Sequence, residues 1–291
     1  MAKFVISAFA DEASDLLDNQ IVALKRNGLN RIEPRSMSGN IIKKSDAELK
    51  EIAAKLRENG ILLSSLGSSI GKYDITADFA PHLEEFYRAI SACKILGCEN
   101  MRIFSFFVPE NELDTYRDEV FKRMEKFISI AKSEGIRLCH ENEAKIYGES
   151  PERVQDLLDN LDGLVGIFDA SNYVVRGHDP VHGYNVTHSK LEYMHVKDAI
   201  AETRQIVPVG MGDGDYKYAI EKANLSTDKT IFLTVEPHLK KFLAYNSIDD
   251  RELKTKLSFE NSDESFDFAV NSLKNLLTEL GYKEDNYSWT K

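Results

Sequence analysis

The chain has 291 residues, of which 42% are hydrophobic and 29% charged, a composition typical of a globular protein with one large core. No segment approaches the ~20 consecutive apolar residues of a membrane helix, and the formal net charge of −11 repels polyanions, so we expect neither a membrane nor a nucleic-acid partner. The three cysteines form no Cys-x-x-Cys pair, and no cleavage site follows the first apolar run, so we expect reduced thiols in a cytoplasmic protein that acts on a small molecule.

Eight apolar runs typical of β-strands recur along the sequence, with helical stretches between them. They occupy residues 4–9, 31–33, 61–66, 100–106, 136–141, 164–169, 191–196 and 230–236. Successive starts lie roughly 27 to 39 residues apart, the length of a strand, two loops and a helix, as parallel strands require. The pattern predicts a single-domain (β/α)8 barrel over residues 1–281. Residues 282–291 are expected to form a tail that packs on the barrel or on another subunit.

The segments between the runs carry helix signals. Residues 46–59 place apolar side chains on one helical face, namely Leu49, Ile52, Ala53 and Leu56. Gly28, Gly60, Gly97 and Gly135 each end such a stretch just before a strand, where a left-handed C-terminal cap favours glycine. A doubly wound open sheet would usually carry a glycine-rich phosphate turn after its first strand, and residues 7–12 contain none. A long polar excursion, residues 239–263, follows the eighth strand.

Acidic and imidazole side chains end four successive predicted strands: Glu141, Asp169, His195 and Glu236. Taken singly, Asp169 is explained as a helix cap, Glu236 as a solvated side chain and His195 as a core histidine. Together, the carboxyl ends of barrel strands bring such groups to one point, and several buried anions require a cation. The pattern therefore predicts a divalent metal site. Its oxygen-rich ligands favour Mn2+ or Mg2+, with Co2+ and Zn2+ as alternatives.

Several sequence segments resemble the xylose isomerase-like TIM barrels of the sugar phosphate isomerase and epimerase type. They are SAFADE (7–12), IEPR (32–35), GSSIGK (67–72), RIFSF (102–106), HEN (140–142), HVKD (195–198) and VEP (235–237). The resemblance covers nearly the whole chain, and the last three segments are the most specific. It implies that Glu141, Asp169, His195 and Glu236 bind the metal and that the two glutamates act as acid and base. It also implies that Arg204 binds substrate.

The implied activity is a metal-dependent isomerase or epimerase of sugars or sugar phosphates, which moves a proton through an enediolate. Ligation through one carboxylate oxygen of Glu141 or Glu236 is expected to leave the other oxygen free as a base. One position departs from the family pattern, because Asn172 stands where Asp-x-x-His would place a histidine. Asn172 can hydrogen-bond a substrate hydroxyl but cannot titrate.

Four further residues are candidates for substrate binding. Lys197 would neutralise charge on a substrate oxygen or form a structural pair with Asp198. Lys72 ends a loop of small residues after the third strand, which lines the pocket or is a plain turn. Phe106 would wall the mouth of the barrel or pack in the core, and Glu33 ends the second strand.

Three other functions remain open. A lyase or dehydratase would expel a β-leaving group from the same enediolate. A DNA-repair endonuclease of the apurinic-site type would need additional histidine ligands and a positive face, which the net charge of −11 opposes. A non-catalytic sugar-binding barrel would keep the fold alone. The sequence leaves open which sugar is bound, whether it is phosphorylated, and whether the chain forms a homo-oligomer.

Overall fold

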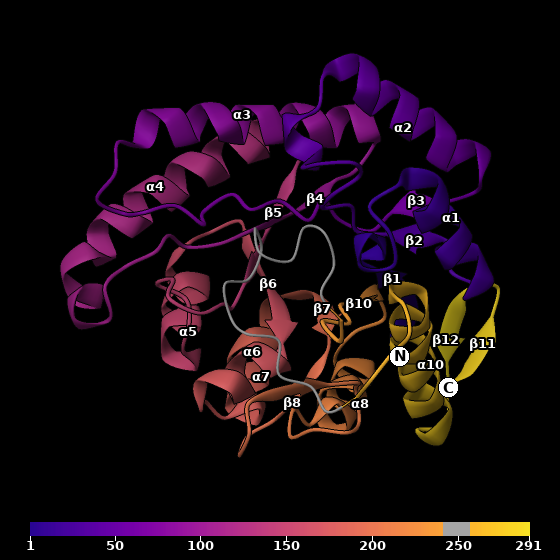
Figure 1. Ribbon diagram of the computed structural model, residues 1–291. Helices are drawn as coiled ribbons and strands as arrows, with labels where there is room; N and C mark the ends of the chain where they lie inside the picture. The colour runs from indigo at the N-terminus through magenta and orange to yellow at the C-terminus, as the bar shows by residue number, and fades with distance from the viewer. Residues whose placement is uncertain (241–256) are drawn as a thin grey trace.

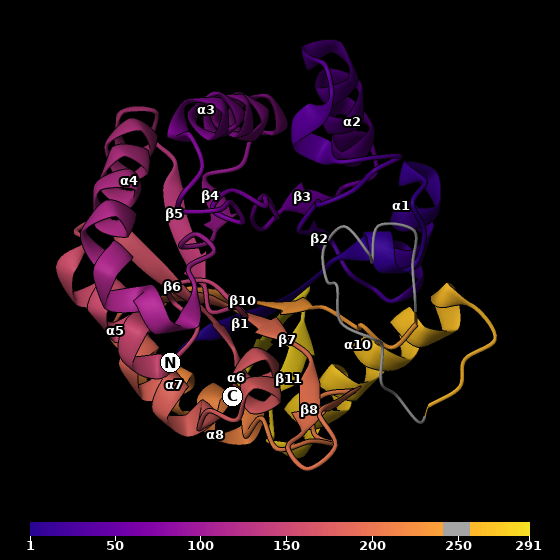
Figure 2. The same cartoon turned by 60° about the vertical axis from the view of Figure 1, so that its left-hand side comes forward.

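In the computed structural model, which describes residues 1–240 and 257–291, eight parallel strands form a barrel inside a ring of helices (Figures 1 and 2). The strands are β1 (Lys3–Ala8), β2 (Arg31–Ile32), β3 (Leu62–Leu63), β4 (Asn100–Ile103), β5 (Arg137–Glu141), β6 (Leu164–Asp169), β7 (Leu191–Val196) and β10 (Thr230–Val235). One continuous sheet runs β4-β5-β6-β7-β10-β1, and β2 pairs with β3. A bond from Glu33 N to Ala8 O joins β1 to β2, and a bridge between Leu66 and Met101 joins β3 to β4. The ring therefore closes, which confirms the predicted TIM barrel.

Helices follow the strands around the outside of the barrel. They are α1 (Leu17–Arg26), α2 (Asp46–Glu58), α3 (Phe79–Leu96), α4 (Leu113–Ser133), α5 (Pro151–Asn160), α6 (Ala170–Arg176), α7 (Pro180–Thr187), α8 (Tyr216–Ser226) and α10 (Ser262–Glu279). Short 3-10 turns are η1 (Ala10–Glu12), η2 (Ile41–Lys43), η3 (Glu110–Glu112) and η4 (His188–Lys190). None of the helices within the described ranges has both the length and the apolar character needed to cross a membrane.

Local sequence signals explain where these helices begin and end. In α2, Ser45 Oγ accepts the N–H of Glu48, and the Glu48 carboxylate accepts the N–H of Ser45, so both end groups are satisfied. All four apolar residues predicted for its inner face are buried. The glycines predicted to end helices have the expected left-handed φ values, 65° at Gly28, 71° at Gly60, 75° at Gly97 and 72° at Gly135.

Two hydrophobic layers build the core. The larger layer packs the helices on the outer faces of the strands, and a small cluster inside the barrel joins Cys139, Ile167 and Tyr193. The next inward-facing residues toward the carboxyl ends of those strands, Glu141 and Asp169 among them, are polar, because side chains alternate along a strand. The interior therefore changes from apolar to charged toward the mouth of the barrel.

Two hairpins extend beyond the predicted elements. β8 (Asp198–Ile200) pairs with β9 (Gln205–Val207) after β7, and β11 (Lys283–Asp285) pairs with β12 (Ser288–Thr290) at the C-terminus. β12 runs antiparallel to β1, with Phe4 opposite Trp289. The C-terminal hairpin thus covers the edge of β1 near Phe4, whereas β2 contacts the other end of β1 at Ala8 (Figure 1). Most of the predicted polar excursion, residues 241–256, lies outside the described residues.

Candidate metal centre

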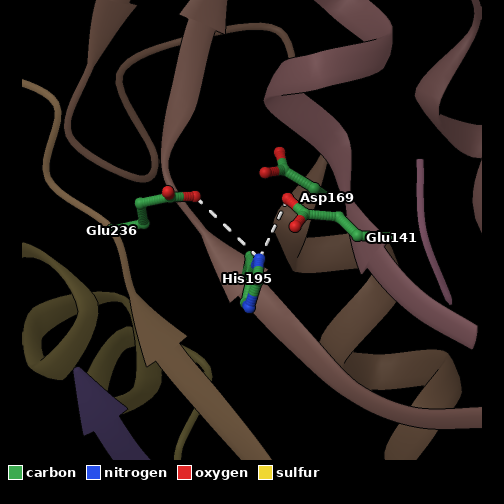
Figure 3. A group of neighbouring side chains, drawn as sticks. All are labelled: Glu141, Asp169, His195 and Glu236. Atoms are coloured by element: carbon green, nitrogen blue, oxygen red, sulfur yellow. Dashed lines mark ion pairs between the residues drawn. The ribbon is translucent and has the colours of Figure 1, made fainter. Parts of the chain in front are cut away.

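The four residues predicted as ligands converge at the mouth of the barrel. Glu141 ends β5, Asp169 ends β6, His195 lies in β7 and Glu236 follows β10. Asp169 is in register with His195, and His195 with Thr234, so the four side chains leave neighbouring strands at similar depth. Each offers a ligand atom within 4.8 Å of the others, and none is more than 2% exposed (Figure 3).

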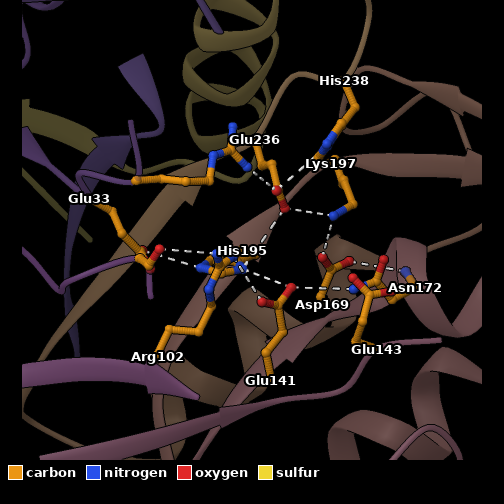
Figure 4. A network of polar contacts seen from close by, with 12 residues as sticks. Glu33, Arg102, Glu141, Glu143, Asp169, Asn172, His195, Lys197, Glu236 and His238 are labelled. Atoms are coloured by element: carbon orange, nitrogen blue, oxygen red, sulfur yellow. Dashed lines mark hydrogen bonds and ion pairs between the residues drawn. The ribbon is translucent and has the colours of Figure 1, made fainter. Parts of the chain in front are cut away.

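The orientation of His195 is set by Glu33. His195 Nε2 lies 3.2 Å from Glu33 Oε2, and Tyr193 donates to Glu33 Oε1 at 3.0 Å. This bond assigns the proton to Nε2 and turns Nδ1 toward Glu141 and Glu236, at 3.0 Å and 3.9 Å. Glu33 was predicted to bind substrate. The structure places it, fully buried, on the far side of the imidazole from these two glutamates (Figure 4).

The two glutamates have matching surroundings. Arg102 Nη1 donates to Glu141 Oε2 at 3.1 Å, and Arg35 Nη1 donates to Glu236 Oε1 at 2.9 Å. The other oxygen of each carboxylate faces His195 Nδ1. An arginine therefore contacts the outer oxygen of each carboxylate, and the role of that oxygen as a base stays a prediction.

Lys197 also belongs to this group. Its Nζ lies 2.8 Å from Asp169 Oδ2 and 2.6 Å from Glu236 Oε2 (Figure 4). The alternative pair with Asp198 does not form. The Asp198 carboxylate instead accepts backbone N–H groups, those of Ala199, Gly210, Gly212 and Gly214.

Charge and burial shift the pKa values of these groups in opposite directions. Burial raises the pKa of Asp169 to about 6, although Lys197 opposes the shift. Burial also disfavours the charged form of Glu141, but His195 and Arg102 hold its pKa well below the ordinary value. For His195, burial lowers the pKa, whereas the adjacent Glu141 and Glu33 more than reverse this and raise it to about 10.

The described residues around His195 carry an excess of negative charge. The buried carboxylates are Asp11, Glu12, Glu33, Glu141, Asp169 and Glu236, and the buried permanent cations are Arg35, Arg102 and Lys197. Burial raises the pKa of Glu12 to about 8, against the opposing effect of Arg35. Six buried carboxyl groups therefore face three permanent cations, an imbalance that a divalent ion would reduce.

The donor chemistry also fits a divalent ion. His195 Nδ1 is buried and makes no hydrogen bond of acceptable geometry with any described residue, although Glu141 Oε1 is 3.0 Å away. Three carboxylates and one imidazole form a set that Mn2+ or Mg2+ accepts, and Co2+ and Zn2+ are compatible. A second group, Glu12, Glu236 and His238, adjoins the first, but Arg35 already contacts carboxylate oxygens of both its glutamates.

Two residues predicted to bind substrate lie beside the four candidate ligands. Asn172 Nδ2 is 3.3 Å from Glu141 Oε1 and donates to Asn142 O at 2.9 Å. Lys72 Nζ donates to Glu143 Oε2 at 3.0 Å and lies 4.6 Å from the centre of the Phe104 ring. Asn172 thus contacts the candidate ligand Glu141 directly. Lys72 instead contacts Glu143, which follows Glu141 by two residues in the sequence.

The structure places Phe106 and Arg204 away from the four candidate ligands. Phe106 has a φ of 67°, and its ring packs on Phe79 of α3 and Phe127 of α4. The ring therefore contributes to the hydrophobic core between the barrel and these helices, while Phe104 faces Lys72 and Arg102. Arg204 is exposed in the β8–β9 turn with a φ of 56°.

Arg102 is a site residue that the strand-end argument did not identify. It stands between Met101 and Ile103 in a strand whose four residues are all buried. An arginine at an inward-facing position of such a strand needs an acidic partner, which is the signal that would have identified it.

Comparisons with known proteins identify the family and the fold. A family model described as xylose isomerase-like TIM barrel matches residues 21–258. No curated protein matches the chain. Among solved structures, a D-tagatose 3-epimerase-like protein superposes with a TM-score of 0.71 at 14% identity, over 95% of this chain and 98% of that one.

Two further structures show the same fold. A xylose isomerase-like TIM barrel protein from Mycobacterium smegmatis in complex with magnesium has a TM-score of 0.66 at 16% identity, over 96% of this chain and 98% of that one. A xylose isomerase-like TIM barrel/4-hydroxyphenylpyruvate dioxygenase fusion protein has a TM-score of 0.71 at 14% identity, over 96% of this chain but 44% of that one. The chain therefore belongs to the xylose isomerase-like TIM barrel family.

Proposed function

We propose that the chain is a divalent-metal-dependent isomerase or epimerase of sugars or sugar phosphates, with Glu141 and Glu236 as acid and base. The observation that carries the proposal is the placement of the two glutamates. They leave β5 and β10 and approach His195 Nδ1 from two directions, at 3.0 Å and 3.9 Å. Two carboxylates on either side of one centre can remove a proton from a substrate carbon and return it at another position or face, through an enediolate.

The proposed ion would be held by Glu141, Asp169, His195 and Glu236. A divalent ion bound there would polarise a sugar carbonyl and the adjacent hydroxyl, and so acidify the C–H between them. Glu33 would keep His195 Nδ1 directed at the site. The four side chains are almost completely buried, and a substrate bound against them would be shielded from bulk water on that side.

The arginines are expected to act in two ways. Arg102 and Arg35 fix the rotamers of Glu141 and Glu236, so that one oxygen of each points inward. Their charge lowers the basicity of the carboxylates, but it also stabilises the negative charge that an enediolate develops between them. Acidification of the substrate C–H then permits a weaker base to remove the proton.

We propose substrate contacts for Asn172, Lys72, Lys197 and Arg204. Asn172 lies beside Glu141 and can donate to a hydroxyl. Lys72 and Lys197 would bind anionic oxygens, and Arg204 would contact the substrate from the β8–β9 turn, which follows the carboxyl end of β7.

The test is proton exchange with solvent. Protein loaded with Mn2+ is incubated in D2O with a panel of ketoses, aldoses and their phosphates, and products are analysed by NMR and mass spectrometry. We expect deuterium at a carbon next to the carbonyl of at least one sugar, and loss of this exchange in Glu141→Gln and Glu236→Gln. Glu192→Gln is the matched control, because Glu192 lies at the opposite end of β7 and pairs with Arg137.

Each other outcome has a definite meaning. Absence of exchange with every sugar would contradict the proposal. Equal exchange in the wild type and Glu236→Gln would remove Glu236 from the reaction. A dehydrated or cleaved product would assign the chain to the lyases.

A further inference from the structure

Lys197 contacts two of the four proposed metal ligands at once. We propose that its ammonium group is a built-in counter-cation that competes with the divalent ion for Asp169 and Glu236, and thereby sets the metal affinity of the site. The inference rests on the proposed metal function. It assigns Lys197 a role opposite to that of a residue that supports the ligands.

The contacts place Lys197 inside the ligand set. Its Nζ lies 2.8 Å from Asp169 Oδ2 and 2.6 Å from Glu236 Oε2. Glu236 Oε2 is also the oxygen that faces His195 Nδ1, at 3.9 Å. The ammonium group and a metal ion would therefore share an oxygen that points to the centre of the group.

The strand geometry explains this placement. Lys197 follows His195 by two residues and stands directly after β7, so both side chains leave the extended chain on the same side. Lys197 is 4% exposed, and its charge is therefore poorly screened by water. In Figure 4 its side chain descends between Glu236 and Asp169.

Two roles of Lys197 predict opposite effects on metal binding. If the lysine mainly orders the carboxylates, its removal loosens the ligands and weakens the binding of the ion. If it competes for them, its removal raises the negative potential of the site, and a divalent ion binds more tightly. Because two like charges in a buried site repel strongly, we expect a gain on the order of tenfold or more.

The experiment is calorimetric titration of metal-stripped protein with Mn2+. Lys197→Met keeps the length of the side chain and removes its charge. We expect its Kd for Mn2+ to be at least about tenfold lower than that of the wild type. Lys190→Met is the matched control, because Lys190 lies before the opposite end of β7 and donates to the backbone oxygen of Leu158 rather than to any of the four proposed ligands. Its Kd is expected to stay within about twofold. An unchanged or higher Kd in Lys197→Met overturns the inference.

Thermal unfolding keeps the test valid if the variant is unstable. Without metal, Lys197→Met leaves two buried carboxylates without their cation, so its Tm should fall below that of the wild type. At saturating Mn2+ the difference in Tm should disappear or reverse, and Lys197→Gln should behave in the same way. If the Tm of both variants stays below that of the wild type at saturating Mn2+, or falls further below it, Lys197 does not compete with the ion. If the wild type binds no divalent ion, the proposed function fails. If the wild type binds Mn2+ and the variants show no gain, only this inference fails.

Discussion

Substitution of Asp169 by asparagine separates metal binding from folding. Asp169 is fully buried, its Oδ1 accepts the N–H of Asn172 at 3.1 Å, and Oδ2 lies 2.8 Å from Lys197 Nζ. Burial raises the pKa of Asp169 to about 6, so in the metal-free fold its ionised form is less favourable than it is in water. Asparagine keeps the size and the Oδ1 acceptor but removes the charge. We expect little change in the metal-free Tm and a large loss of metal binding.

The magnitude follows from binding linkage. At an Mn2+ concentration of about 100 times Kd, the wild type gains about 2.7 kcal/mol. For a chain of this size 1 kcal/mol shifts Tm by about 2–4 °C, so the expected rise is about 5–10 °C. Loss of a charged ligand should weaken binding by about 100-fold or more, which reduces the rise at the same concentration to about 1–2 °C.

The assay is differential scanning calorimetry of Asp169→Asn, with and without Mn2+. Glu143→Gln is the control, because Glu143 lies two residues after Glu141 but pairs with Lys72. We expect the control to keep the full wild-type rise in Tm. A full rise in Asp169→Asn, or its loss in Glu143→Gln, would refute the reasoning.

Three further predictions follow from the same contacts. Glu33→Gln should lower the affinity for Mn2+ by about 10- to 100-fold in calorimetric titration, because His195 loses its carboxylate partner; an unchanged affinity would contradict the role of Glu33. Because the pKa of His195 is raised to about 10 on folding, its contribution to stability is complete below pH ~6.5 and is lost as the pH rises through about 10. Urea unfolding of metal-free protein across this range should detect the loss, and the opposite trend would argue against a protonated His195. Trp289→Ala should lower the free energy of unfolding by about 3 kcal/mol and Tm by at least about 6 °C, because the buried Trp289 side chain covers the edge of β1. The affinity for Mn2+ should be preserved, because this edge lies far from the proposed ligands, and weakened Mn2+ binding would contradict this separation.

The fold and the four converging side chains were predictable because both depend on periodic patterns. Strand and helix runs repeat along the chain, and the carboxyl ends of barrel strands share one face. Glu141, Asp169, His195 and Glu236 each stand at such an end, so their convergence follows from topology alone. The left-handed glycines at the helix ends were predictable for a similar reason, since the cap requires a positive φ.

The partners of these side chains depend on register and on local backbone conformation. Arg102 reaches Glu141 because β4 and β5 pair with Ile103 opposite His140, and the sequence alone does not state this register. Phe106 points to the helices because its backbone is left-handed, which a non-glycine residue rarely adopts.

The central claim is that one divalent ion is held by these four residues. Anomalous diffraction from crystals grown with Mn2+ tests it most directly. The account predicts one strong anomalous peak within ligand distance of Glu141, Asp169, His195 and Glu236. A peak elsewhere in the molecule, or the absence of any peak at saturating Mn2+, would contradict it.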